Sequence, residues 1–549
     1  MGKKSKRTRN VESKTNTNQE SNSNHAELLI SPPKKLASES TPKSKSATTL
    51  EETFENLQFE DPFEDEYEEE ILAEDDDNYK DNDNADINNG KQDDNNGETN
   101  SKIVQSWTPF SNKHKLSPDE KLEIDESAYT MHHALTPEWP SLSFSILKDN
   151  LGDSRTRFPH SMICAIGTQA DKAEKNRLTV MKLSDLAKTN TKSNEDDEME
   201  KPYDEEDDEN ENENDDDNED LDPTLEHISI RHNGGVNRVR AMPQMPNIVA
   251  TWSDVGNVYM YNVQSILDTF DRSIGRPAGN MNNNHRSPFF TYQGHATEGY
   301  AMDWSSVVTG QFASGDCSGS IHLWSPQQIT DKTKNPSTSS FQITSNAYTS
   351  SHKESVEDIQ WSPTESTVLA SAHCGGNVKI FDTRRTKQAM LTHNASNNTG
   401  IDINVIAWNH NVSNLLATGA DDGVFSVWDL RTFSSSSSKK IVEPLARFTC
   451  HNTPITSLEW HPTDESMILV SDDDAAYVYD LSIETDDVDT MEQKMDQNDD
   501  DDDVEIPPQL LFVHAGSSFV KECHWHPQIP SLIMSTAQTG FSVFVPSNL

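Results

Sequence analysis

Three runs of carboxylates are the part of this chain whose residue types favour a definite chemistry. Residues 51–94 contain 20 acidic and 2 basic residues, residues 195–222 contain 19 and 1, and residues 484–505 contain 12 and 1. Together the runs carry a net charge of −47, against −48 for the whole chain. Because like charges repel and bury no apolar surface, we predict solvated, mobile segments that attract a strongly basic protein and repel nucleic acid.

Patterns for catalysis or metal binding are weak by comparison. Cys523, His524 and His526 stand close together, but the repeat alignment below assigns Cys523 to the core and His526 to a turn. The chain has no phosphate-binding glycine loop and no G-x-S-x-G elbow. Carboxylates in mobile runs lack the fixed, desolvated setting of general acid–base catalysis. We therefore expect a binding protein without metal or cofactor, and not an enzyme.

The composition indicates one large folded domain with long polar segments. Of the 549 residues, 32% are hydrophobic, and the mean hydropathy is −0.80. The five cysteines are scattered without a C-x-x-C pair, which predicts reduced thiols. No apolar run approaches the ~18 residues of a membrane span, and the start, MGKKSKRTR, lacks the apolar core of a signal peptide. We expect neither secretion nor membrane insertion.

A repeated tryptophan organises the chain from about residue 230 onward. Five apolar alternations end on a Trp and are followed 19 or 20 residues later by a second aromatic. The first set is Trp304, Trp361, Trp408, Trp460 and Trp525, and the second is Trp324, Phe381, Trp428, Tyr479 and Phe544. A sixth copy begins near His232, and an irregular one begins near His160. The units resemble the WD-repeat family, which implies an all-β, seven-bladed propeller whose aromatic residues pack between blades.

In the WD-repeat family a His, a Ser or Thr, an Asp and a Trp form a hydrogen-bonded network inside a blade. Here His295, Ser314 and Trp324 fit three of these positions, but Cys317 stands where the Asp is expected. We therefore expect the network to be incomplete in every blade.

The remaining sequence divides into segments around the propeller. We expect a basic disordered tail at 1–50, an acidic disordered region at 51–115, an N-terminal helix and closing strand at 116–147, and the propeller at 148–549. Residues 1–45 contain 10 basic and 4 acidic residues, which indicates a nuclear or nucleolar import signal or, alternatively, a solubilising tail. Helical spacing of Ile124, Ala128, Met131 and Leu135 predicts the helix, which Pro137 ends.

The acidic loops at 187–223 and 484–506 fall between the third and fourth strands of blades one and six. These blades flank blade seven, whose outer strand we expect from Leu142, Phe144 and Ile146 at the other end of the chain. The three acidic runs are thus predicted to converge on one sector of one face. Drift of a permissive surface loop is the alternative, since long insertions add little closure entropy.

Two stretches carry a more specific resemblance. Residues 127–147, SAYTMHHALTPEWPSLSFSIL, and residues 499–514, DDDDDVEIPPQLLFVH, resemble the histone-binding WD-repeat proteins, in which a groove between helix and acidic loop takes a basic histone helix. The acidic tail, Tyr129-x-Met131-x-His133 and residues 521–528, KECHWHPQ, resemble the glutamate-rich WD-repeat family more closely. That resemblance implies a nuclear and nucleolar ribosome biogenesis factor, and a dedicated chaperone of the basic large-subunit ribosomal protein L-three in 60S assembly.

The resemblance also implies which residues bind the client. They are Tyr129, His132 and Glu138 near the N-terminal helix, and Asp501, Asp502, Asp503, Glu505, Pro507 and Pro508 in the third acidic run. Two other functions remain open. One is a histone chaperone or a component of a chromatin complex. The other is a ubiquitin-ligase adaptor, because Asp382-Thr383-Arg384 and Asp429-Leu430-Arg431 resemble an adaptor-docking motif that is also ordinary in WD repeats. In each case we expect a monomer that contacts neither nucleic acid nor membrane directly.

Overall fold

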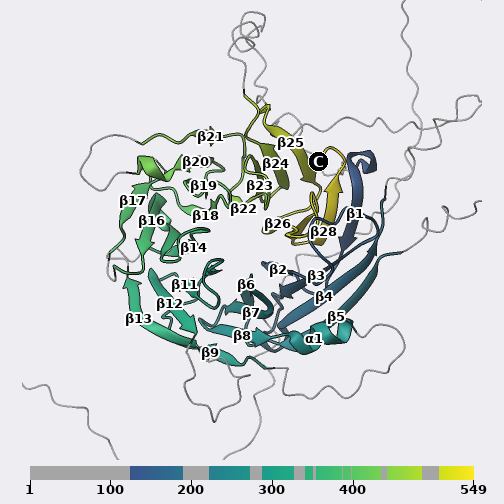
Figure 1. Cartoon of the computed structure of the whole chain (residues 1–549), viewed down its shortest axis with the longest axis horizontal. Helices are drawn as coiled ribbons and strands as arrows, with labels where there is room; N and C mark the ends of the chain where they lie inside the picture. The colour runs from purple at the N-terminus through teal and green to yellow at the C-terminus, as the bar shows by residue number, and fades with distance from the viewer. Residues whose placement is uncertain are drawn as a thin grey trace, which may run out of the picture. The chain divides into compact units, whose positions relative to one another are not determined.

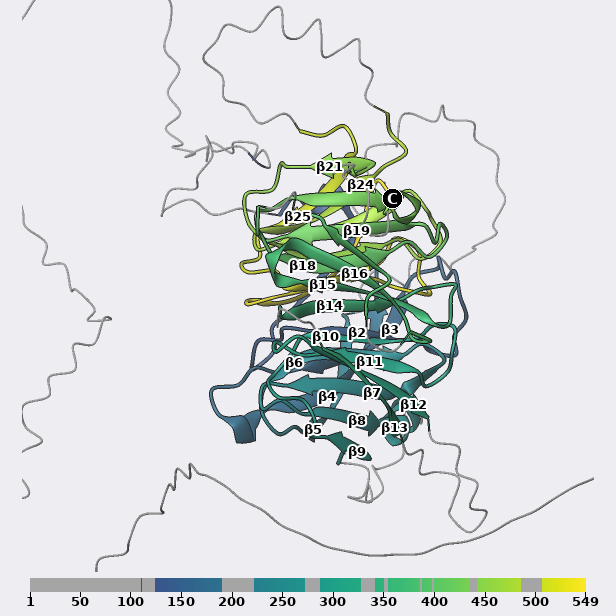
Figure 2. The same cartoon turned by 90° about the vertical axis from the view of Figure 1, so that its left-hand side faces the viewer.

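Seven four-stranded antiparallel sheets form a ring in the computed structural model of this chain (Figure 1), and Figure 2 shows the ring from the side. The structure describes residue 110 and residues 124–189, 222–271, 287–326, 341–349, 354–385, 388–396, 399–433, 442–484 and 506–549. This arrangement confirms the predicted seven-bladed propeller. Within these residues no helix has the length and apolar character needed to span a membrane.

Each blade is numbered in ring order and written from its innermost strand outward. Blades one to four are β2 (Phe144–Leu147), β3 (His160–Gly167), β4 (Arg177–Leu186) and β5 (Thr224–Arg231); β6 (Val236–Met242), β7 (Met245–Ser253), β8 (Val258–Asn262) and β9 (Phe290–Tyr292); β10 (Ala301–Trp304), β11 (Phe312–Gly315), β12 (Ser320–Pro326) and β13 (Phe341–Thr349); and β14 (Val356–Trp361), β15 (Val368–His373), β16 (Asn377–Asp382) and β17 (Leu391–Asn394).

The remaining blades follow the same plan, except that the last is completed from the other end of the chain. Blades five to seven are β18 (Ile403–Trp408), β19 (Leu415–Ala420), β20 (Phe425–Asp429) and β21 (Ala446–Phe448); β22 (Ile455–Trp460), β23 (Met467–Asp472), β24 (Ala475–Asp480) and β25 (Leu510–Ala515); and β26 (Glu522–Trp525), β27 (Ile533–Ala537), β28 (Gly540–Pro546) and β1 (Tyr129–Leu135). The short helices are α1 (Gln264–Phe270) and the 3-10 turns Glu126–Ala128, Ala173–Lys175, Cys374–Gly376 and Leu430–Thr432.

The tryptophans that define the repeat are buried where neighbouring blades meet. Trp304, Trp361, Trp408, Trp460 and Trp525 each end an innermost strand. The Trp304 indole donates to the backbone carbonyl of Arg240 in the preceding blade at 3.1 Å, and the Trp460 indole donates to that of Ala407 at 3.0 Å. Trp324 and Trp428 lie instead in third strands and donate to a hydroxyl of the adjacent second strand.

The hydrogen-bonded network that we expected to be incomplete is complete in blade three. His295 lies 2.9 Å from the Asp316 carboxylate and 2.8 Å from the Ser314 hydroxyl, which also accepts from the Trp324 indole at 3.0 Å. The expectation failed by one residue, because Asp316, and not Cys317, follows the second strand and turns toward the histidine. The network therefore contributes to this blade after all.

The predicted N-terminal helix is wrong over residues 129–135. This segment is the strand β1, which pairs antiparallel with β28 from Tyr129 opposite Pro546 to Leu135 opposite Phe541. Without β1, β28 would be an open sheet edge with unpaired backbone groups, so the ladder outweighs the helical spacing of the apolar residues. Residues 116–123 of the predicted helix lie outside the described residues.

The predicted closing strand was also wrong in its position. Phe144 and Ile146 belong to β2, which is the innermost strand of blade one, while β1 supplies the outer strand of blade seven. The ring is therefore closed by the N-terminal strand as predicted in principle, but by residues some ten positions earlier in the chain.

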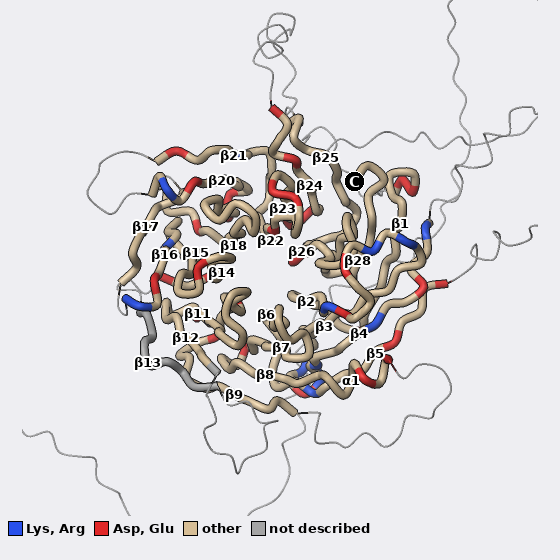
Figure 3. Tube along the Cα trace, viewed as in Figure 1, with Lys and Arg blue, Asp and Glu red and all other residues tan. Residues whose placement is uncertain are grey.

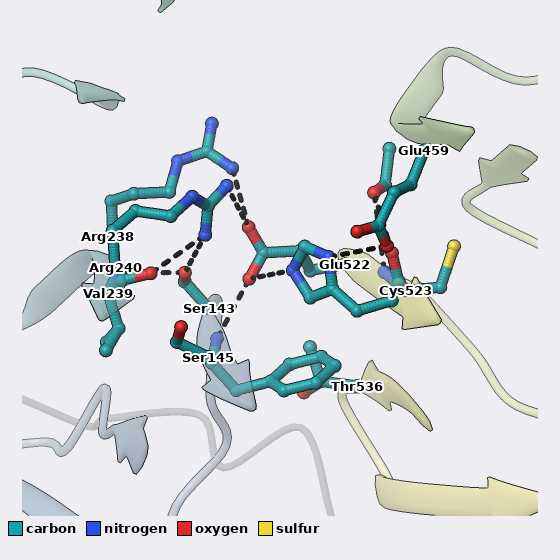
Figure 4. A network of polar contacts seen from close by, with 12 residues as sticks. Ser143, Ser145, Arg238, Val239, Arg240, Glu459, Glu522, Cys523 and Thr536 are labelled. Carbon is teal, nitrogen blue, oxygen red and sulfur yellow. Dashed lines mark hydrogen bonds and ion pairs between the residues drawn. The ribbon is translucent and has the colours of Figure 1, made fainter. Parts of the chain in front are cut away.

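Blades six, seven, one and two are joined near the axis by a cluster of buried charges around Glu522 (Figure 4). The Glu522 carboxylate is 1% exposed and lies 2.8 Å from the guanidinium nitrogens of both Arg238 and Arg240. It also accepts from the Phe144 backbone N–H at 2.8 Å and lies 3.4 Å from His524, which in turn contacts Glu459 at 3.1 Å.

The charges in this cluster fix the protonation states of its members. Burial alone would raise the pKa of the Glu522 carboxyl, but Arg240, His524 and Arg238 outweigh it and hold that pKa well below its usual range. Burial opposes the charge of His524, but Glu459 and Glu522 raise its pKa to about 9. Glu522 is therefore ionised and His524 is protonated at neutral pH.

Replacing Glu522 by Gln is expected to lower the free energy of unfolding by about 3 kcal/mol or more, because two arginines are left beside a neutral partner in a buried site. Urea unfolding followed by tryptophan fluorescence measures the change. The matched control is Glu174→Gln at an exposed position, which should change stability by less than about 0.5 kcal/mol. Equal effects of the two substitutions would contradict the role of the cluster.

Stability is also expected to depend on the charge of His524. Its pKa is raised in the folded protein, from 6.5 to about 9, so its contribution is complete below pH 6.5 and is lost as pH rises toward 9. The thermal stability of the wild type should thus fall over this interval, and His524→Gln should show a flatter decline. An unchanged slope in the variant would exclude His524 as the origin.

Candidate functional site at blade seven

The acidic loops leave the ring at the two blades beside blade seven. Residues 187–223 connect β4 to β5 in blade one, and residues 481–509 connect β24 to β25 in blade six, each between the third and fourth strand. In antiparallel blades these connections open on the face where the fourth strand begins. Tyr129, the first residue of β1, lies at that same face of blade seven. The predicted blade positions of both loops are therefore confirmed.

The stem of the blade-one loop crosses to blade seven and covers the free edge of β1. The Thr189 N–H donates to the Thr130 carbonyl at 3.2 Å, and the Thr189 hydroxyl accepts from the His132 N–H at 3.1 Å. The His133 ring lies 3.1 Å from the Ala187 carbonyl. These contacts tie the start of the second acidic run to the outer strand of blade seven. Sequence reasoning missed them, because the stem lacks any periodic pattern.

The stem of the blade-six loop is fixed on the other side. The Leu510 N–H donates to the Pro507 carbonyl at 2.9 Å, and the Gln509 amide donates to the Ile483 carbonyl at 2.8 Å across the base of the loop. Pro507 is half-buried and Pro508 is exposed. Asp501, Asp502, Asp503 and Glu505 lie outside the described residues, as do residues 51–94 and most of the second run, so their convergence stays a prediction.

Tyr129 lies in the seam between blades six and seven. Its side chain is 4% exposed, and its hydroxyl is 2.8 Å from Nδ1 of His514 on β25. The ring packs edge-on against Phe512 and Phe544 at 5.3 and 6.0 Å between centroids. Burial raises the pKa of Tyr129 and lowers that of His514 to about 3, so both groups stay neutral. Tyr129 positions the strand and offers little surface to a partner.

His132 and Glu138 have different surroundings. The half-buried His132 ring lies 5.0 Å from the Tyr129 ring and 5.5 Å from the His514 ring, and burial lowers its pKa. It thus presents a neutral aromatic surface near neutral pH. Glu138 is exposed in the connection that follows β1, at the face opposite to the acidic loops. The structure brings His132 and Pro508 to the loop-bearing side of the ring but leaves Glu138 on the other.

The described residues hold no group of three or more potential metal ligands. Cys523 is fully buried, His524 belongs to the charge cluster, and His526 Nδ1 accepts from the backbone N–H groups of Gln528 and Ile529 at 3.0 Å. These three side chains therefore serve three separate structural contacts.

The two Asp-x-Arg motifs are internal ion pairs. The Nε atom of Arg384 lies 2.9 and 3.0 Å from the two Asp382 oxygens, and that of Arg431 lies 2.9 Å from both Asp429 oxygens. Each pair closes the turn after a third strand. The guanidinium groups are nevertheless 71% and 72% exposed, and such exposed pairs add little stability. Both Asp-x-Arg turns are thus explained by the repeat itself.

Tyr129→Phe is expected to lower the free energy of unfolding by about 1–2 kcal/mol, because a buried nitrogen of His514 loses its partner. Tyr292→Phe removes a similar Tyr–His bond to His322 at a half-buried position and should cost less, since water replaces the lost partner there. Urea unfolding of both variants makes the comparison. An equal or larger loss for Tyr292→Phe would contradict the structural role of Tyr129.

Charges on the rest of the described surface are mixed, with Lys and Arg interspersed among Asp and Glu around the ring (Figure 3). No comparable basic segment accompanies the acidic loops in the described blades, so the electrostatic asymmetry of the molecule is concentrated in the runs that leave blades one and six.

Known proteins resemble this chain both in parts and over nearly its whole length. Residues 119–187 match the family described as the histone-binding protein RBBP4 or a component of the CAF1 complex, and residues 344–382 and 442–480 match "WD domain, G-beta repeat". The "Ribosome assembly protein rrb1" of Schizosaccharomyces pombe is 40% identical over 489 residues, which cover 88% of this chain and 92% of the relative.

Two further relatives have similar coverage. The "Glutamate-rich WD repeat-containing protein 1" of Dictyostelium discoideum is 40% identical over 79% of this chain and 83% of its own length. The "Protein HEAT STRESS TOLERANT DWD 1" of Arabidopsis thaliana is 37% identical over 79% of this chain and 90% of its own. With this identity, this coverage and a seven-bladed ring, the chain belongs to the glutamate-rich WD-repeat family that includes the ribosome assembly protein rrb1.

Proposed function

We propose that this protein is a ribosome biogenesis factor that chaperones a basic protein of the large ribosomal subunit, with ribosomal protein L-three as the expected client. The observation that carries the proposal is the anchoring of two acidic loops on the two sides of blade seven, one through Thr189 on β1 and one through Pro507 and Gln509 before β25. The name of the S. pombe relative supports the ribosomal role.

The proposed chemistry is the neutralisation of a cationic client by many carboxylates. Each exposed ion pair contributes about 0–1 kcal/mol, so useful affinity requires several pairs and apolar contact as well. Runs of this charge also steer a basic protein to the site and compete with RNA for it. His132 and Pro508 supply candidate contact surface beside the loops, and no step of this function requires catalysis.

The same proposal assigns the protein to the nucleus and nucleolus, where the basic residues of the first 45 positions would serve for import. A basic ribosomal protein bound there is kept soluble and away from premature contact with RNA until it joins the preribosomal particle. The protein would act as a monomer, because β1 closes the ring within one chain.

A histone is the second candidate client. It is favoured by the match of residues 119–187 to the histone-binding family description, a stretch that contains β1 and runs to the first residue of the loop stem at Ala187. Competition between a histone-helix peptide and the purified ribosomal protein separates the two candidates. Stronger retention of histones than of any ribosomal protein from a cell extract would exclude the first.

Neutralising Asp501, Asp502, Asp503 and Glu505 together, as Asn and Gln, is expected to weaken binding of the basic client about tenfold or more at low salt, and less at high salt. Calorimetric titration with L-three at two salt concentrations measures this. The matched control neutralises four exposed carboxylates in the connections between second and third strands, Asp254, Asp421, Asp422 and Asp474. Those connections open on the opposite face, so the control should bind nearly as wild type; an equal loss would show that only net charge matters.

A further inference from the structure

Phe110 is the one residue before Ile124 that the structure describes, and it is buried in the ring. Its side chain is 7% exposed and belongs to the apolar cluster between blades five and six. The ring stacks on Tyr477 of β24 at 5.3 Å with an interplanar angle of 15°, and it meets His451 edge-on at 5.2 Å. An aromatic residue far outside the repeats thus contributes to the seam between two blades.

The contact covers one of the hydrogen-bonded networks. His451 lies 2.8 Å from the Asp472 carboxylate and 3.0 Å from the Tyr479 hydroxyl, and the side chains of His451 and Asp472 are 0% and 2% exposed. Phe110 lies against the outer side of this arrangement. The histidine and its partners are therefore shielded from water by a side chain that the repeat itself does not provide.

Blade two shows the same slot without a comparable side chain among the described residues. His232, Tyr259 and Tyr261 correspond in the repeat to His451, Tyr477 and Tyr479, and His232 bonds to Thr251 at 2.9 Å. These three residues line a cavity of about 250 Å³, together with Arg231, Asn233, Ser287 and Pro288. The comparison indicates that the fold leaves an aromatic-lined slot beside the histidine, which Phe110 fills in blade six.

The backbone of Phe110 is consistent with a residue held by its side chain. Its φ of 65° lies in the left-handed region, which a bulky residue seldom adopts and which costs of order 1–3 kcal/mol. Stacking and burial of a phenyl ring offset a cost of this size. The conformation is thus explained by the docked ring and not by local sequence preference.

We propose that Phe110 is an anchor that docks the N-terminal region of this chain in the slot between blades five and six. Asp94, the end of the first acidic run, precedes Phe110 by 16 residues. At no more than ~3.4 Å per residue, the anchor confines that end to within about 55 Å of Phe110. The acidic tail is therefore tethered by a specific side-chain contact as well as by its covalent link to β1.

The experiment compares hydrogen exchange of the full-length protein with that of Phe110→Ala, Phe110→Leu and the matched control Phe63→Ala, which removes the same side chain from within the acidic run. Phe110→Ala should accelerate exchange about fivefold or more in β25 and around His451, with the other blades unchanged. Phe110→Leu should lie between it and wild type, and Phe63→Ala should match wild type.

A second measurement locates the ring directly. Benzoylphenylalanine at position 110 of the full-length protein should crosslink to peptides of blades five and six, whereas the same residue at position 63 should give no preferred blade. Unchanged exchange in Phe110→Ala, or crosslinks from position 110 spread over the ring, would overturn the proposal. Acceleration throughout all seven blades would also overturn it, because it would indicate general destabilisation without a local anchor.

Discussion

The propeller depends on satisfying the innermost strand of each blade, whose inner edge has no neighbouring strand to pair with. Backbone N–H groups there would be costly if left unpaired. In several seams a side chain of the preceding blade accepts the bond, among them Glu522 for Phe144, Ser143 for Val239, Asp303 for Trp361, Asp358 for Ile406, Gln360 for Trp408 and Glu459 for Trp525. Blades are thus joined by directed bonds near the axis in addition to apolar packing between their faces.

This arrangement explains why carboxylates are tolerated so close to the axis. Burial raises the pKa of Asp303 to about 7 despite its bond to the Trp361 N–H and the charge of Arg240. Glu522 behaves differently because two arginines and a protonated histidine surround it. The same chemical group therefore serves as a partly neutral acceptor in one seam and as a charged centre in another. The acidic character of the chain has two unrelated origins, one structural and one in the loops.

Much of the architecture could be predicted because its signals are local. The spacing between the two aromatic positions of each repeat indicated the blades, and the loops between third and fourth strands followed from it. What could not be predicted depended on distant partners. The apolar spacing of Ala128, Met131 and Leu135 suits a helix, and the partner that makes it a strand lies some 400 residues away in β28. Asp316 was missed because one residue of register in a turn decides which side chain reaches His295.

The candidate site shows the same division. The acidic runs and their blades were evident from charge and repeat position, whereas Thr189 was not, because its role comes from a strand edge that only the closed ring creates. Tyr129 illustrates how resemblance carries a residue without its role: its position in the chain was correct, but it is buried against His514. Glu138 follows closely in sequence, yet β1 separates it from Tyr129 by the depth of the blade.

Closure by β1 has a consequence for how the protein is made. β1 leaves the ribosome early, but its partner β28 is completed some 400 residues later, which at 5–20 residues per second is about 20–80 s. During that interval β1 has no strand to pair with, and the contacts of Thr189 have no formed edge to bind. The two loop stems come to flank a common strand only when translation is nearly finished. A nascent chain thus has its acidic charge long before it has the geometry that gathers it.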